Sequence, residues 1–339
     1  MDAANMVTES LIEKYVSKFK RAINTIQSQG FSYFVQNYSH AVPYKFFRAK
    51  KSKIHFTEPI WRNINFKALN LEASAKLLLN PLDDGFSKEF YLYGFREPLN
   101  TFAIYNTVAK TRPVVLDVGG NLGYFPLVEL AAGAKKVIAV EPVPSTFALL
   151  SKTLTDFDRA ELLNIAISDR NQALRLYVGA KRNVTSTSKS LLTSTGHIVA
   201  EEINIDALTL ASMAKKYPIT MVRMDVEGHE YRILANDLPN QIRTLCVELH
   251  IIPPYDKPQA VGLLQSIAEQ KFDISIAINE MNYGYYPIIQ HCGLKSTYKL
   301  ATSLNSRLQD CPKIQTGLSF DELVNQLKEG TVIHLLLQR

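Results

Sequence analysis

An alternation of short apolar runs with helical patterns, which begins at Pro113, constrains the fold more than any other feature of this sequence. Apolar runs typical of buried strands occupy 113–120, 135–142, 160–168, 220–226, 243–250, 272–278 and 331–338. Apolar residues at helical spacing occupy 98–110, 122–133, 144–157 and 257–270. Strands that alternate with helices indicate a doubly wound α/β fold with a mainly parallel sheet. Such sheets bind ligands outside the carboxyl ends of their strands.

The chain of 339 residues has room for one large domain and an extension. We expect a basic, mostly helical N-terminal extension over residues 1–90 and the main domain over residues 91–339. Two stretches interrupt the alternation, 179–208 and 279–330, and we treat the second as an insertion. Long connections within a compact domain are often lids or binding loops, so we expect both to lie near a ligand.

Composition limits the class of protein. No run of about 18 apolar residues predicts a transmembrane helix, and the N-terminus lacks the apolar segment of a signal peptide. The cysteines, Cys246, Cys292 and Cys311, have no metal-like spacing and fit a reduced, cytoplasmic protein. Residues 1–67 hold eleven Lys and Arg against four Asp and Glu, a local charge of +7. This segment is either a solvated helical face or a surface that binds nucleic acid, anionic lipid or a phosphorylated substrate.

A glycine-rich turn follows the first strand, in the segment VVLDVGGNLGYF (114–125). Glycine at 119, 120 and 123 lets the backbone turn sharply and approach a ligand closely. The dinucleotide pattern G-x-G-x-x-G would require glycine where Asn121 and Tyr124 stand, which disfavours a dehydrogenase. A turn that binds no pyrophosphate and has Asp117 beside it suits a ligand with a cationic amino-acid end, and S-adenosylmethionine is the usual such ligand.

Glu141 ends the second strand, eighteen residues beyond Gly123. A carboxylate at this position can accept hydrogen bonds from both hydroxyls of a ribose. The same position serves nicotinamide enzymes, so Glu141 indicates a ribose without choosing the cofactor. The alternative is that Glu141 only caps the end of the strand before Pro142.

Six segments together resemble the FkbM-type S-adenosylmethionine-dependent methyltransferases in order and spacing. They are 114–125, 137–150, 164–168, 203–208, 223–234 and 246–250. The resemblance covers about residues 90–250, and its most specific parts are E-P-x-P at 141–144 and D-V-E-G-H-E at 225–230. It implies a class I methyltransferase fold with a seven-stranded sheet and O-methylation of sugars or small molecules. Gly120 and Arg223 depart from the family, which usually has Ala and Lys there.

The cofactor implied by the resemblance is S-adenosyl-L-methionine. The resemblance and the glycine turn together nominate a cofactor-binding set of Asp117, Gly119, Asn121, Gly123, Glu141, Pro142, Ala166, Ile167 and Asp225. In this set Asp225 is expected beside the reacting centre, where a carboxylate stabilises the cationic cofactor. The substrate does not carry over from the family, because residues 1–90 and 279–330 lie outside the resemblance.

The segment RMDVEGHE (223–230) is dense in ionisable groups. Asp225, Glu227 and His229 would share a face and resemble a metal set if the strand continued, but Gly228 should break it, so we expect no metal. An acid/base role fits better, because a hydroxyl needs a base to remove its proton. His229 and Glu227 are the main candidates beside Asp225, and Glu230 and His250 are rivals.

These observations favour a methyltransferase that acts on a hydroxyl of a glycan, a lipid-linked sugar or a small metabolite. An RNA methyltransferase that uses residues 1–67 is the alternative, and a non-catalytic binding protein with the same fold is a third hypothesis. The hydroxyl-rich segment NVTSTSKS (183–190) is either part of the acceptor site or a plain loop. The oligomeric state is not indicated by any pattern.

Overall fold

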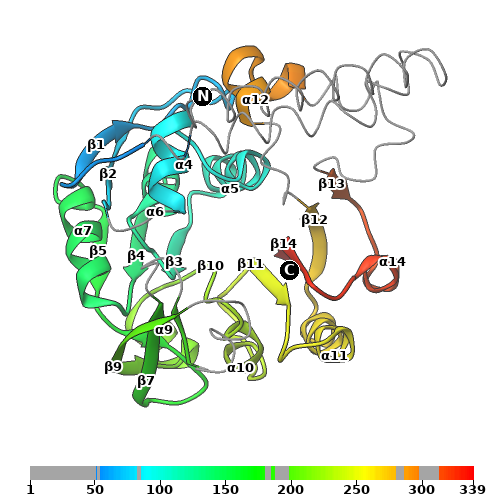
Figure 1. Cartoon of the computed structure of the whole chain (residues 1–339). Helices are drawn as coiled ribbons and strands as arrows, with labels where there is room; N and C mark the ends of the chain where they lie inside the picture. Colours follow the sequence, from blue (N-terminus) through cyan, green and yellow to red (C-terminus); the bar gives the residue numbers. More distant parts are fainter. Residues whose placement is uncertain are drawn as a thin grey trace, which may run out of the picture.

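The computed structural model describes residues 51, 54–81, 85–179, 185–187, 198–279, 286–297 and 313–339. Its central sheet has eight strands (Figure 1). In spatial order they are β13 (Lys313–Thr316), β12 (Asp273–Asn279), β14 (Thr331–Gln338), β11 (Thr244–Ile251), β10 (Met221–Met224), β3 (Val114–Val118), β4 (Lys136–Val140) and β5 (Ala160–Leu163).

The sheet is mainly parallel, as the sequence predicts. Strands β5, β4, β3, β10 and β11 are parallel neighbours, and β14 lies antiparallel between β11 and β12. The predicted class I doubly wound fold is therefore confirmed. The eighth strand, β13, was not predicted and extends the edge beside β12.

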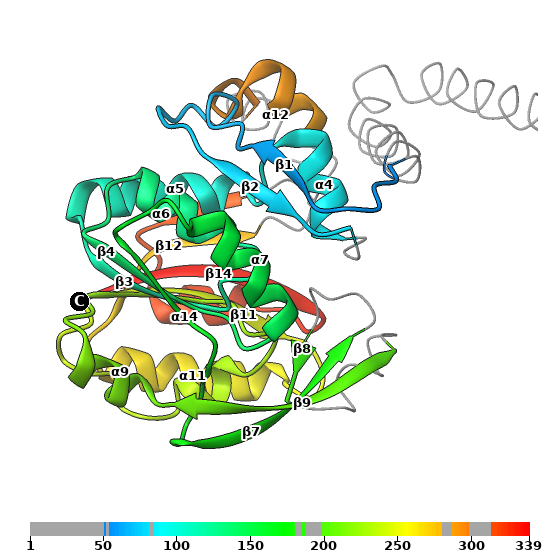
Figure 2. The same cartoon turned by 90° about the vertical axis from the view of Figure 1, so that its left-hand side faces the viewer.

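Helices cover both faces of the sheet (Figure 2). Alternate residues of β3 point to opposite faces, so Val115 lies in one hydrophobic core and Leu116 in the other. The first face packs against α5 (Pro98–Thr111), α6 (Tyr124–Ala131) and α7 (Pro144–Leu154). The second packs against α9 (Leu210–Lys216), α10 (Glu230–Ile233), α11 (Lys257–Glu269) and α14 (Phe320–Gln326).

The predicted third strand, 160–168, is in fact two short strands in different sheets. After β5, the side chain of Asn164 donates to the carbonyl oxygens of Glu141 and Pro142, at 2.8 and 3.1 Å, and the chain leaves the central sheet. A second sheet follows in the order β6-β9-β7-β8. Its strands are β6 (Ala166–Ile167), β7 (Gln172–Gly179), β8 (Thr185–Ser186) and β9 (Val199–Leu208).

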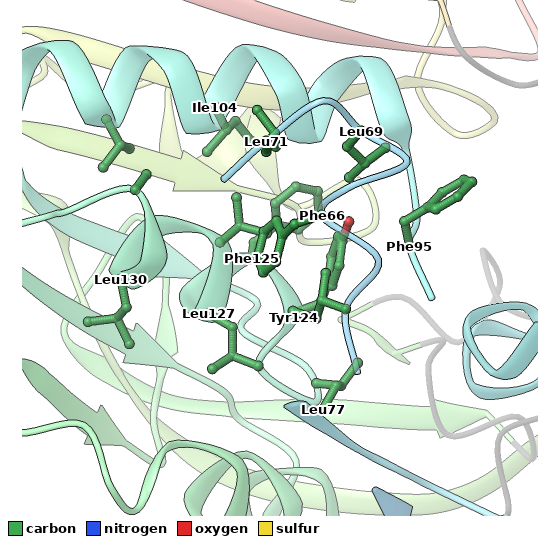
Figure 3. Packing of buried hydrophobic residues seen from close by; sticks show 14 of the residues in the cluster. Phe66, Leu69, Leu71, Leu77, Phe95, Ile104, Tyr124, Phe125, Leu127 and Leu130 are labelled. Atoms are coloured by element: carbon green, nitrogen blue, oxygen red, sulfur yellow. The ribbon is translucent and has the colours of Figure 1, made fainter. Parts of the chain in front are cut away.

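The described part of the N-terminal extension contains two strands that the sequence did not reveal. β1 (Ile60–Asn63) and β2 (Lys76–Leu79) form an antiparallel pair, and α4 (Phe86–Tyr93) follows. Aromatic rings such as Phe66 and Phe95 join Tyr124 and Phe125 of α6 in one core (Figure 3). Residues 1–50, which hold most of the basic charge of the predicted extension, lie outside the described residues.

The 279–330 insertion contributes α12 (Tyr286–Cys292), β13 and α14 in its described parts. The backbone N–H of Leu294 donates to the carbonyl of Ala68, and that of Glu97 donates to the Tyr286 hydroxyl. The insertion therefore packs against the N-terminal segment and the start of α5. Among the described helices, none is both long and apolar enough to cross a membrane.

Candidate functional site

The glycine turn after β3 lies tightly against two neighbouring strands. The backbone N–H groups of Gly119 and Gly120 both donate to the carbonyl of Val140, at 3.0 and 2.9 Å. Gly119 has φ +84°, and a methyl group added there would overlap the carbonyl oxygen of Asp225. Position 119 therefore requires glycine for two reasons, its left-handed backbone and the approach of β10.

Glu141 is fixed by the same turn. Its Oε2 accepts the backbone N–H of Asn121 at 3.0 Å, and its Oε1 accepts that of Val143 at 2.9 Å. Asn121 reaches this position with a left-handed φ of 48°. Burial raises the pKa of Glu141 to about 7, although the two backbone donors oppose the shift. Each oxygen still has a lone pair for a further donor.

A cavity lies between this turn, the end of β10 and the second sheet. Among its lining residues are nine that the sequence nominates: Gly119, Asn121, Glu141, Pro142, Ala166, Ile167, Asp225, Glu227 and His229. The sequence missed the apolar and hydroxyl side chains of the opposite wall: Leu174, Leu176, Thr185 and Thr187. The two threonines belong to the hydroxyl-rich segment 183–190, whose composition was the available signal.

Two nominated residues do not line the cavity. Asp117 is fully buried beneath the glycine turn. Gly123 begins α6 with φ +99°, and a methyl group there would press on Leu150 and Thr153 at 3.1 Å. Asp117 and Gly123 therefore support the turn from behind, and their direct contact with a ligand stays a prediction.

Arg223 connects the acidic groups at this edge. Its guanidinium donates to the carbonyl of Gly119 and to Asp225 Oδ2, both at 3.1 Å, and lies 3.7 Å from Asp117 Oδ1. It also stacks on the Phe125 ring at 4.2 Å. Burial raises the pKa of Asp117 to about 6, although Arg223 opposes the shift. Burial acts in the same sense on Asp225, but the positive charge of Arg223, together with that of neighbouring side chains such as His250, outweighs it, so the pKa of Asp225 is lowered.

His229 is buried in the cavity wall with a partner at each ring nitrogen. Nε2 lies 2.9 Å from the Ser168 hydroxyl, and Nδ1 lies 3.2 Å from the Thr187 hydroxyl. Ser168 donates its own proton to Asp169, so it accepts from Nε2–H, and Nδ1 then accepts from Thr187. Burial lowers the pKa of His229 to about 4. The ring is therefore neutral at pH 7 and has no free lone pair.

A different histidine, His250, lies among carboxylates at the end of β11. Its Nδ1 is 2.6 Å from Oε1 of the fully buried Glu230, and its Nε2 is 3.5 Å from Glu227 Oε2. The Glu227 side chain is 41% exposed and also lines the cavity. The sequence named Glu230 and His250 only as rival bases, and it gave no sign that they pair across twenty residues.

The comparison with family models agrees with this arrangement. A scan against family models matches residues 117–274 to the methyltransferase FkbM domain. A search of curated proteins finds no match.

The similar solved structures have low sequence identity. The S-adenosylmethionine-dependent methyltransferase from Agrobacterium tumefaciens is 10% identical, with a TM-score of 0.40 over 85% of this chain and 72% of that one. The ribosomal protein L11 methylase from Lactobacillus delbrueckii subsp. bulgaricus is 11% identical, with a TM-score of 0.33 over 72% and 80%.

The matched region contains the glycine turn, Glu141 and the acidic segment after β10, which together form most of the cavity. These are also the segments that carry the family resemblance in the sequence. Residues 117–274 are thus an FkbM methyltransferase domain, and the chain is an S-adenosylmethionine-dependent methyltransferase.

Proposed function

We propose that this methyltransferase acts on a hydroxyl oxygen of a glycan, a lipid-linked sugar or a small metabolite. The observation that carries the proposal is the position of Asp225 and Glu227. Both line the cavity, and both also belong to a group of carboxylates around the His250 imidazole at the ends of β10 and β11. Proton-accepting groups thus adjoin the end of the cavity where methyl transfer is expected, as O-methylation requires.

The residues of the cavity fit S-adenosylmethionine. Glu141 is oriented by two backbone donors and keeps lone pairs for the ribose hydroxyls. Apolar side chains from β6 and β7, Ile167, Leu174 and Leu176, provide a surface for the adenine ring. Asp225 has the lowered pKa that a carboxylate facing a sulfonium needs. The cofactor supplies an electrophilic methyl group on a positively charged sulfur.

Among the candidate bases we assign Glu227 to the proton. Bound S-adenosylmethionine would supply the methyl group, and the Glu227 carboxylate would accept the proton that the acceptor hydroxyl loses. His229 is less suitable, because both of its ring nitrogens already have hydroxyl partners. We assign His229 to positioning: it joins Ser168 of the β6 segment to Thr187 of the opposite cavity wall.

A labelled-methyl transfer screen tests this function. The full chain is incubated with cell extract that has been separated into glycans, lipids, small molecules, RNA and protein. We expect label in a glycan, lipid or small-molecule fraction, and we expect Glu227→Gln to lower the rate by about 10²–10⁴. Label confined to RNA would favour the alternative function through the basic segment 1–67, and label confined to protein would contradict both.

A further inference from the structure

A row of ionisable side chains crosses the first face of the sheet at the carboxyl ends of its strands. Arg223 of β10 pairs with Cys246 of β11, so the next residues on the same face are Asp225 and Glu248. Glu248 in turn pairs with His334 of β14. The register alone thus brings groups from three strands together. His250, two residues after Glu248, extends the row to the end of β11.

The imidazole of His250 is oriented for a ligand other than protein. Only 9% of its side-chain surface is exposed. The buried carboxylate of Glu230 accepts Nδ1–H at 2.6 Å, so Nε2 is the ring nitrogen that faces the other carboxylates. Within the described residues, Nε2 has no hydrogen-bond partner, and it points at Glu227 and Glu248. Metal-binding histidines commonly donate their other N–H to a carboxylate in this way.

Glu248 and Asp225 complete a set of donors around this nitrogen. Oxygen atoms of both carboxylates and a ring nitrogen of His250 lie within 4.8 Å of one another. His250 Nε2 is 3.9 Å from Glu248 Oε1 and 3.5 Å from Glu227 Oε2. Donors about 2.1 Å from a Mg²⁺ ion lie roughly 3–4.2 Å apart. Glu248 is only 17% exposed and accepts no hydrogen bond from the described part of the chain.

A neighbouring group of Glu97, Glu248 and His334 has a similar composition but different bonding. The amide of Asn100 lies 3.0 Å from Glu97 Oε2 and 3.1 Å from His334 Nδ1. The two hydrogens of the amide thus allow it to donate one hydrogen bond to the carboxylate and one to the imidazole. The Nδ1 atom of His334, which faces Glu248, therefore already accepts a hydrogen bond from the protein, whereas Nε2 of His250 accepts none from the described residues.

We propose that Asp225, Glu248 and His250 form a binding site for a hard divalent cation, Mg²⁺ or Mn²⁺, with Glu227 at its open side. This set differs from Asp225, Glu227 and His229, which the sequence analysis rejected as a metal set, and in the structure His229 faces Ser168 and Thr187. Asp225 also lines the cofactor cavity, so a cation here would hold an acceptor oxygen beside the methyl donor. That role rests on the proposed function, whereas cation binding itself does not.

Binding of Mn²⁺ to the full chain tests the site without turnover. After treatment with EDTA and removal of the chelator, electron paramagnetic resonance of free Mn²⁺ gives the affinity and the stoichiometry. We expect one site, and we expect His250→Gln and Glu248→Gln each to weaken binding at least tenfold. Glu230→Gln should weaken it by about 10–100-fold through loss of the oriented imidazole. The matched control, His334→Gln, should change it less than twofold.

Two results would overturn the inference: no Mn²⁺ site with millimolar or better affinity, or a His250→Gln variant that binds like the parent. If a variant folds poorly, the parent still decides, because bound Mn²⁺ must raise its thermal midpoint. Failure of the proposed function looks different. Methyl transfer to hydroxyl compounds that persists in EDTA would refute a role for the cation in turnover and support the proposed function. Mn²⁺ binding without methyl transfer to any hydroxyl compound would support the cation site and refute the proposed function.

Discussion

Replacing Arg223 tests whether its buried guanidinium stabilises the carboxyl ends of β3 and β10. Arg223→Met keeps a side chain of similar length but removes the charge and both hydrogen bonds, to Gly119 and Asp225. It leaves Asp117 fully buried next to the equally buried carboxyl group of Glu129, without the positive charge of Arg223. Arg223→Lys, the residue usual in the family, keeps the charge and loses the planar, two-pronged geometry.

The distances set the expected size of the effect. At 3.7 Å from Asp117, and with an effective dielectric constant of about 20, the attraction is about 4.5 kcal/mol before desolvation is subtracted. Removal of one partner of a buried ion pair typically costs about 3–5 kcal/mol. We therefore expect Arg223→Met to lose about 3–5 kcal/mol of unfolding free energy. Arg223→Lys should lose about 1–2 kcal/mol, from one hydrogen bond and the stacking on Phe125.

Urea denaturation at several pH values measures both variants. Without Arg223, the folded-state pKa of Asp117 rises further above its unfolded value of 3.8. The folded state then binds more protons than the unfolded state, so the stability of Arg223→Met falls as pH rises. Its deficit should be smaller at pH 5 than at pH 8. A variant as stable as the parent at pH 8, or a deficit independent of pH, would refute this account.

Three further substitutions address the cavity. Gly119→Ala should cost about 2–5 kcal/mol in urea denaturation, because the methyl group overlaps Asp225. Gly133→Ala has a similar φ but open space, and an equal loss there would exclude the overlap as the cause. The affinity for S-adenosylmethionine should rise about tenfold from pH 6 to pH 8 in calorimetry as Glu141 ionises, and Glu141→Gln should abolish this dependence. His229→Gln should lower kcat/KM less than tenfold, and a loss of 10²–10⁴ would instead identify His229 as the base.

The sequence by itself determined the class of fold and predicted which residues of the glycine turn and of the second strand end line the cavity. The reason is that these signals are local: a buried strand, a glycine turn and a helix are encoded within 114–131, and Glu141 stands at the end of the next strand. Parallel strands then bring their carboxyl ends to one edge whatever the details of packing. Gly119, Asn121 and Glu141 therefore line the same cavity.

Only the tertiary structure assigned a role to each charge in RMDVEGHE. Arg223 turned inward to Asp117, His229 joined two cavity walls, and Glu230 paired with His250 of another strand. The row that joins Asp225 to Glu248 and His334 depends on strand register, and the split of 160–168 depends on the contacts of Asn164 with the previous loop. Register and side-chain direction arise from contacts between residues far apart in the chain, which no short pattern in the sequence contains.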